Sequence, residues 1–267
     1  MVDITIDVID RGTFRADLNF MVEGAVLAGL ANQNPDIDFV EFPVYNLVID
    51  HPDATILWDT GIHHESGEGH WPDWMFDAFP AEDAADHRLD DDLEDNGWSM
   101  DDIDCVAMTH LHVDHSGGLG FFDGTDVPIY VHEDEIKYAY YSMVTDEASD
   151  AYLLDDLHLD LDWEIIHRDR TELFEGIEFI RSPGHTPGLL STKVELDDGN
   201  TVIFTGDEVY MSANYYEEQP LGAGLLWDKQ KWFDSLHTLK ELERRHNAEM
   251  VFGHPPDQID EIRSGWS

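Results

Sequence analysis

The most informative stretch of this chain is Thr109-His110-Leu111-His112-Val113-Asp114-His115-Ser116-Gly117-Gly118. Its centre, from His110 to His115, places three imidazoles and one carboxylate within six consecutive residues. Such crowding is unfavourable without a bound ion, because protonated imidazoles repel one another and these side chains bury little apolar surface. A divalent metal ion removes the conflict, since neutral imidazole and carboxylate are its natural ligands. The stretch therefore predicts a metal site.

The spacing within this cluster indicates more than one ion. His110 and His112 are two residues apart, so in an extended segment their side chains point the same way and can share one ion. Asp114 and His115 follow where the chain should turn into a glycine pair, and their different direction suits a second ion beside the first. One short turn cannot fill two coordination spheres, so the remaining ligands must come from other segments.

Three later segments each place a ligand-type side chain directly after a glycine and a strand-like run. Glycine in that position lets the backbone turn sharply and approach the ions closely. Loops at strand ends are also where a rigid sheet usually presents functional groups. The three candidates are His185 in Gly184-His185-Thr186-Pro187-Gly188, Asp207 in Thr205-Gly206-Asp207, and His254 in Gly253-His254.

These motifs, taken in order, resemble the metallo-β-lactamase superfamily of dinuclear metallohydrolases. The turn Asp59-Thr60-Gly61 resembles an early Asp-Thr-Gly turn of the same superfamily, so the likeness covers nearly the whole chain. The resemblance implies an α/β fold, a four-layer αββα sandwich with the metal site at one edge of the two sheets. We expect one domain over residues 1–267, with an acidic and aromatic excursion at about residues 63–95 near the site entrance.

The resemblance also implies a ligand set and two divalent metal ions. Asp59 would orient a ligand histidine. Zinc is the first choice for the ions, although the same ligands accept manganese, iron or cobalt. In the implied arrangement one ion is held by His110, His112 and His185, the other by Asp114, His115 and His254, and both by the bridging carboxylate of Asp207.

Tyr210, three residues after Asp207, resembles the Asp-x-x-Tyr arrangement of the N-acyl homoserine lactonase group. That likeness implies a hydrolase that opens a lactone by attack of a metal-bridging hydroxide. Tyr210 would hydrogen-bond the carbonyl oxygen, and Asp114 or a bound water would protonate the leaving alkoxide. The alternative for Tyr210 is a packing residue with a solvated hydroxyl.

Two other enzyme classes of the same superfamily remain as alternatives. A thioesterase of the hydroxyacylglutathione hydrolase kind would need basic residues near its C-terminus, where Arg244 and Arg245 are the only close pair. A mononuclear iron thiol dioxygenase would use only part of the ligand set. Metal stoichiometry separates these classes, because two ions per chain favour hydrolysis and one iron favours oxygen chemistry.

The charge balance limits the partners. The chain has 59 acidic and 14 basic residues, a formal net charge of −45, so it should repel nucleic acids and anionic membranes. The acidic residues run through the whole sequence, which resembles proteins of extremely halophilic archaea; an ordinary solubility surface is the alternative. We expect a small-molecule lactone or ester as substrate and a homodimer as the assembly.

The N-terminal segment and the apolar runs predict where the protein is located. Residues 1–7 are acidic and alternating, unlike a signal peptide, and no apolar run is long enough for a bilayer, so we expect a cytoplasmic protein.

Within the excursion, His63 or His64 could line the substrate cavity or remain solvated. The aromatic residues of the excursion could cover an acyl chain or form local core; they are Trp71, Trp74, Phe76 and Phe79.

Overall fold

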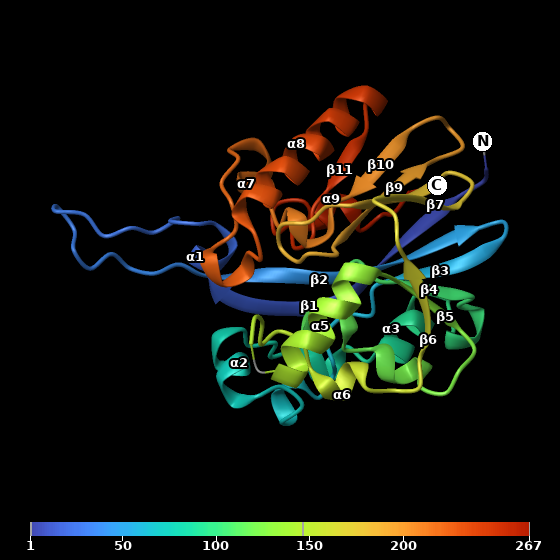
Figure 1. Ribbon diagram of the computed structural model, residues 1–267, viewed down its shortest axis with the longest axis horizontal. Helices are drawn as coiled ribbons and strands as arrows, with labels where there is room; N and C mark the ends of the chain where they lie inside the picture. Colours follow the sequence, from blue (N-terminus) through green and yellow to red (C-terminus); the bar gives the residue numbers. More distant parts are fainter. Residues whose placement is uncertain (1, 146, 267) are drawn as a thin grey trace.

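Two facing β-sheets form the centre of the molecule (Figure 1). The computed structural model describes residues 2–145 and 147–266. In the first sheet β1 to β3 run antiparallel and β3 to β6 run parallel. Its strands, in spatial order, are β1 (Thr5–Asp17), β2 (Phe39–His51), β3 (Ala54–Trp58), β4 (Cys105–Ala107), β5 (Pro128–His132) and β6 (Asp162–Ile166).

The second sheet has the spatial order β11-β10-β9-β8-β7. Its strands are antiparallel except for β11, which pairs with β10 in parallel. Buried side chains of both sheets, including Leu47, Trp58, Phe179 and Val194, pack into one apolar layer between them. The strands are β7 (Arg170–Phe174), β8 (Ile177–Arg181), β9 (Leu190–Glu195), β10 (Thr201–Phe204) and β11 (Glu249–Val251).

Helices cover the outer faces of both sheets, as Figure 1 shows. α8 (Lys229–His246) packs Leu236 and Leu239 in the same cluster as Ile203 and Met250 of the second sheet. On the other side α3 (Leu89–Asp95), α5 (Glu133–Thr145) and α6 (Leu154–Leu157) pack against the first sheet. The four layers confirm the predicted αββα sandwich.

The remaining helical segments are short and lie in the connections. The α-helical ones are α1 (Leu18–Met21), α2 (Asp73–Ala78), α4 (Val113–Ser116), α7 (Ser212–Tyr216) and α9 (Ile259–Ile262). The 3₁₀ turns are Ser66–Glu68, Ala84–Asp86, Met100–Asp102, Leu119–Phe122, Gly206–Glu208 and Ala223–Leu225. Among the helices of the described residues, none combines the length and the apolar character that crossing a membrane requires.

The beginning of α8 shows how local chemistry sets an element boundary. The sequence pattern predicts a helix from Trp227 to about His246, but the first helical residue is Lys229. Asp228 acts as the N-cap, with its carboxylate accepting hydrogen bonds from the backbone N–H groups of Gln230 (2.8 Å) and Lys231 (3.0 Å). At the other end Asn247 adopts the left-handed conformation (φ 49°) that terminates the helix.

The N-terminal region differs most from the sequence-based expectation. The alternation of polar and apolar residues over Asp3–Ile9 predicts a strand there, whereas β1 continues to Asp17 and pairs with β2 along its length. A register shift between Asp10 and Thr13 interrupts the alternation of apolar and polar residues, so the second half of the strand carried no clear signal. After α1, residues 22–38 extend away from the body of the molecule as a projecting arm (Figure 1).

Candidate metal centre

Five strand ends of the two sheets meet at one edge of the molecule. β3 leads to Asp59, β4 to the histidine cluster, β8 to His185, β10 to Asp207 and β11 to His254. Rigid strands therefore deliver each short ligand-bearing loop to the same place. All seven predicted ligands lie there in two groups of neighbouring ligand atoms, His110, His112 and His185 in one, and Asp114, His115, Asp207 and His254 in the other.

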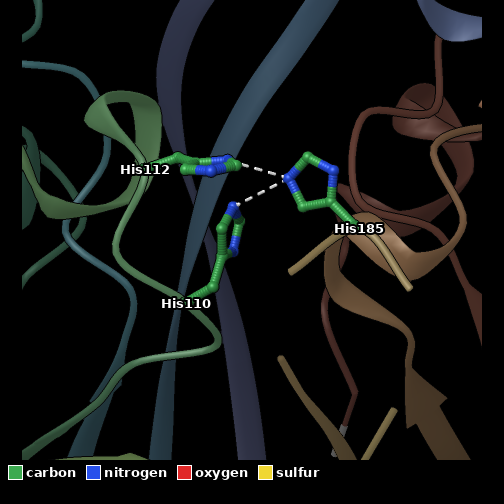
Figure 2. Close-up of side chains that lie close together, drawn as sticks. All are labelled: His110, His112 and His185. Carbon is green, nitrogen blue, oxygen red and sulfur yellow. Dashed lines mark hydrogen bonds between the residues drawn. The ribbon is translucent and has the colours of Figure 1, made fainter. Parts of the chain in front are cut away.

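Figure 2 shows how the ring nitrogens of the three-histidine group converge. Nε2 of His185 lies 2.9 Å from Nδ1 of His112 and 3.2 Å from Nε2 of His110. His110 and His112 come from the loop after β4, and His185 comes from the opposite sheet. All three side chains are buried.

The far nitrogens of two of these rings, His185 and His110, have partners of their own. His185 donates from Nδ1 to the carbonyl oxygen of Leu225 at 2.7 Å. His110 places its Nδ1 3.0 Å from the hydroxyl of Thr109, which itself donates to Asp59 at 2.7 Å. Neutral rings held in this way present lone pairs to each other at 3.2 Å, an arrangement that a cation between them stabilises.

The second group contains buried polar atoms without hydrogen-bond partners. Nε2 of His115 and of His254 and both carboxylate oxygens of Asp207 are buried and unpaired among the described residues. These atoms lie close together, because Nε2 of each histidine is 3.3 Å from an oxygen of Asp207. Asp114 completes the group, with its Oδ2 3.4 Å from Nε2 of His254. Buried unpaired donors and acceptors are costly, so this donor set fits a divalent ion.

Asp207 joins the two groups. Its Oδ2 lies 3.7 Å from Nε2 of His110 and 3.6 Å from Nε2 of His185, in addition to its contacts within the second group. The side chain is completely buried, so water does not compensate its charge. This position between the groups is the one that a bridging carboxylate requires.

Protonation equilibria differ between the groups. Burial and the neighbouring His115 hold the pKa of His110 well below 6.5, and burial also lowers the pKa of His112 and of His185. These rings are therefore neutral, the form that binds metals. In the second group burial lowers the pKa of His254, but the carboxylates of Asp207 and Asp114 outweigh it and raise the value to about 9. The field there favours a positive charge.

Asp59 contacts the metal site from behind. Its carboxylate accepts hydrogen bonds from Nδ1 of His115 (2.8 Å) and from the backbone N–H of Thr109 (2.7 Å). The bond to His115 leaves Nε2 of that ring facing Asp207. Asp59 is buried and has a positive φ of 58°, so the Asp-Thr-Gly turn holds an uncommon backbone conformation at this point.

A cavity of about 540 Å³ opens beside the candidate ligands His112, Asp114 and His185. Three of the four aromatic residues named in the excursion line it, namely Trp71, Trp74 and Phe79. Phe76 instead packs against the apolar core. Part of the excursion therefore forms one wall of the cavity.

His63 and His64 do not line this cavity. They form a stack with His70, whose ring centroid is 3.6 Å from that of His63, and Nε2 of His70 contacts the buried carboxylate of Asp156 at 2.6 Å. Neither residue therefore lines this cavity, which is one of the two possibilities that the sequence left open. Their closeness to the Asp-Thr-Gly turn in sequence did not determine which way the rings point.

Tyr210 lies at the inner end of the cavity. Its ring centroid is 5.0 Å from that of His254 and 5.7 Å from that of His185. The side chain is buried, and burial together with the negative charge of Asp207 raises its pKa well above 10. The phenol therefore keeps its proton and can act as a hydrogen-bond donor.

Two buried glutamates near the ligands had no signal in the sequence. Glu208 accepts a hydrogen bond from the backbone N–H of His185 at 3.2 Å. Glu135 accepts hydrogen bonds from the loops on both sides of the three-histidine group. Glutamate side chains are usually exposed, so only the tertiary structure reveals these buried positions.

A family model described as the metallo-beta-lactamase superfamily matches residues 40–254, which include all the candidate ligands. The chain belongs to the metallo-beta-lactamase superfamily. Its two-sheet architecture and its ligand order follow the pattern expected for members of that superfamily.

Relatives within the superfamily include named lactonases. The chain is 29% identical over 263 residues to N-acyl homoserine lactonase AiiB of Agrobacterium fabrum, with 94% of each chain covered. It is 27% identical over 228 residues to N-acyl homoserine lactonase AiiA of Bacillus thuringiensis subsp. kurstaki, covering 84% of this chain and 86% of the relative.

Solved structures show the same fold. An N-acyl homoserine lactone hydrolase with the product N-hexanoyl-L-homoserine at its catalytic metal centre matches with a TM-score of 0.81 and 24% identity, over 98% of this chain and 97% of that chain. AidC, a dizinc quorum-quenching lactonase in complex with a product, matches with a TM-score of 0.69 and 15% identity, over 96% and 90%.

Proposed function

We propose that this protein is a dinuclear metal-dependent lactonase that opens N-acyl homoserine lactones. The observation that carries the proposal is the meeting of two ligand groups at Asp207, directly beside a cavity that holds Tyr210. The relatives named as N-acyl homoserine lactonases, aligned over most of the chain, support the choice of substrate.

The proposed ligands follow the two groups. His110, His112 and His185 would hold one ion, Asp114, His115 and His254 the other, and Asp207 both. Two such ions would lower the pKa of a shared water, and so supply a hydroxide near neutral pH, and they would stabilise negative charge that develops on oxygen. Zinc is the proposed ion, because the donor set of imidazole and carboxylate suits it.

Tyr210 and Asp114 have separate proposed roles in ring opening. Tyr210 donates a hydrogen bond to the carbonyl oxygen of the lactone, which becomes negative in the transition state. Asp114 lines the cavity and is the one partly exposed residue of the second ligand group. Asp114 would accept the proton that the attacking hydroxide carries and pass it to the alkoxide that leaves when the ring opens, so the product carries a free hydroxyl and a carboxylate.

The walls of the cavity suit an apolar acyl chain. Trp71, Trp74 and Phe79 form one side of the cavity. Leu225 and Leu226, which lie in the loop before α8, also line it. Burying each methylene of an acyl chain against such side chains contributes roughly 0.8 kcal/mol of binding free energy. We therefore propose that the acyl chain lies along this wall while the lactone ring faces Tyr210.

A substrate panel in molar salt tests the proposal. We expect acyl homoserine lactones to be hydrolysed with a higher kcat/KM than aryl esters, glutathione thioesters or phosphodiesters. The metal content of the same preparation should be two ions per chain. Preferential hydrolysis of a thioester, or one iron per chain with consumption of oxygen and thiol, would replace the lactonase proposal by one of the two alternatives.

We also propose a saline cytoplasm as the environment and exclude nucleic acids and anionic membranes as partners. The net charge of −45 supports both statements, because it is tolerated where salt screens it and it repels polyanions elsewhere. Phosphodiester hydrolysis in the substrate panel would contradict the exclusion of nucleic acids.

A homodimer is the proposed assembly, with the projecting arm at residues 22–38 as its contact. Residues 24–35 contain no charged side chain, although the chain is highly charged elsewhere. Leu27 and Leu30 on this arm are 77% and 94% exposed. Two copies that repel each other through their acidic surfaces can meet at such an uncharged apolar segment. Light scattering should give a dimer for the parent and a monomer for Leu30→Asp; a monomeric parent would contradict this proposal.

A further inference from the structure

Glu135, the third residue of α5, is completely buried behind the three-histidine group. Its carboxylate lies between the two loops that supply the histidines of that group. From one side the backbone N–H of Leu111, which separates His110 from His112, donates to Oε1 at 3.1 Å. From the other side the backbone N–H of Gly188, three residues after His185, donates to Oε2 at 3.2 Å.

A third donor connects Glu135 to the wall of the substrate cavity. The hydroxyl of Tyr152 donates to Oε1 at 2.9 Å. The ring of Tyr152 lies against His112, with ring centroids 4.7 Å apart, and the preceding residues of its loop line the cavity. One carboxylate therefore contacts both histidine loops and the residue that packs on a ligand ring.

The backbone around Gly188 shows how close this contact is. A Cβ atom on Gly188 would lie 2.2 Å from the backbone nitrogen of Glu135, so a side chain there would separate the loop from α5. Both oxygens of the carboxylate are used, and each accepts from a backbone N–H of a different histidine loop. The two loops come from opposite sheets, and Glu135 is the shared acceptor between them.

We propose that Glu135 is a positioning residue that fixes the spacing between the His110–His112 loop and the His185 loop, and so sets the metal affinity of the three-histidine group. The proposal rests on the ligand assignment within the proposed function and is independent of which substrate is hydrolysed. Glu135 does not contact the ligand nitrogens and acts only through the backbone that carries them.

Replacement of Glu135 by Gln tests this role with almost no change in volume. A glutamine has one acceptor oxygen and one donor NH₂ group, so in either orientation its NH₂ group faces a backbone N–H. At least one of the two loops loses its acceptor. Loss of such a supporting partner costs on the order of 10–100-fold in metal affinity. We expect that loss for one of the two ions and unchanged affinity for the other.

The measurement is a titration of metal-free protein with Co²⁺ alone, in molar salt, followed by the visible absorption of the bound ion and by competition with a chelator. His254→Ala removes a ligand of the second group and so identifies which absorption belongs to which group. Glu175→Gln, the same chemical change on an exposed side chain, is the matched control and should bind two ions as the parent does.

The proposal is contradicted if Glu135→Gln binds both ions with the affinity of the parent. It is also contradicted if the variant loses both affinities equally or loses its fold, because Glu135 would then support the whole domain rather than one group. No lactone is present in the titration. The outcome is therefore independent of whether acyl homoserine lactones are the substrate.

Discussion

At the scale of single residues, the histidine rings of the site are oriented by hydrogen bonds from the ring nitrogen that faces away from the metal site. His185 and His254 each donate from Nδ1 to a backbone carbonyl oxygen, and His115 donates to Asp59. These bonds fix which nitrogen faces the metal site. The groups that accept these hydrogen bonds therefore set the orientation of the histidine rings.

Tyr210→Phe tests the assignment of the phenol as a hydrogen-bond donor to the reacting carbonyl. The ring remains in place between His185 and His254, so packing and both metal ions should be retained. Removal of one donor to a developing oxyanion lowers kcat by on the order of 10²–10³. The measurement is kcat for lactone hydrolysis together with metal content; full activity in the variant would show that Tyr210 only packs.

The candidate ligands were predictable from sequence because each carries a local signal. His110, His112, Asp114 and His115 are crowded into one turn, and the others each follow a glycine after a strand-like run. Glu135 and Tyr152 carry no such signal. Their positions depend on contacts between segments that lie far apart in the chain, and only the assembled sheets bring those segments together.

At the scale of elements, strand ends and tight turns place the loops. Most strands were predictable, because alternation and turn residues mark them. The strand-like runs at residues 103–108, 127–131 and 249–252 agree with β4, β5 and β11 to within two residues at either end. The second half of β1 was not, because its register shift breaks the alternation. The projecting arm at residues 22–38 was not predicted either, since it has neither helical nor strand periodicity.

Substitution of Gly117 tests the close packing between the end of α4 and the loop at His63. A Cβ atom at residue 117 would lie 2.1 Å from the backbone nitrogen of His63, where neither segment has room to move. We expect Gly117→Ala to lower the free energy of unfolding by at least about 1–3 kcal/mol. Gly120→Ala is the matched control, because nothing lies within 4 Å of the added Cβ atom. Urea unfolding in molar salt measures both; equal stabilities would contradict this packing.

The contact between His70 and Asp156 links the excursion to α6 and should make stability depend on pH. Burial lowers the pKa of His70, but the hydrogen bond to Asp156 and the charges of Asp156, Asp155 and Glu65 outweigh it and raise the pKa above 6.5. Protonated His70 therefore stabilises the fold. This contribution is complete below pH 6.5 and is lost as the pH rises through the folded-state value.

The free energy of unfolding of the parent and of His70→Gln, measured at pH values below and above 6.5, tests this pH dependence. We expect the stability difference between the two proteins to be largest below pH 6.5 and to shrink at higher pH. The neighbouring ring of His63 has a pKa lowered to about 4, chiefly by burial and by His70, so it stays neutral throughout. A difference that does not change with pH would rule out a charged pair.

At the scale of the whole molecule, charge is the dominant feature. The buried acidic side chains of the described residues are Asp59, Asp92, Glu135, Asp156, Asp207 and Glu208. Three of them, Asp59, Glu135 and Glu208, contact the candidate ligands or the loops that carry them, and Asp207 is itself a candidate ligand. The rest of the acidity belongs to the surface, where it affects solubility and association rather than the fold.

Removal of salt should therefore unfold the protein. At about 1 M salt the Debye length is roughly 3 Å, and at 0.01 M it is roughly 30 Å, so dilution exposes each surface carboxylate to the repulsion of many others. We expect the far-UV circular dichroism signal to fall during dialysis to near-zero salt and to recover when salt is restored. An unchanged spectrum would show that the acidity is an ordinary solubility surface.

The most direct test of the account is lactone hydrolysis by one preparation before and after removal of its metal ions, at constant molar salt. We predict two ions per chain and hydrolysis of an N-acyl homoserine lactone. Activity should disappear with a chelator and return in proportion to the ions added back, up to two per chain. Ring opening that persists in metal-free protein, or its absence in protein that holds two ions, would contradict the proposed function.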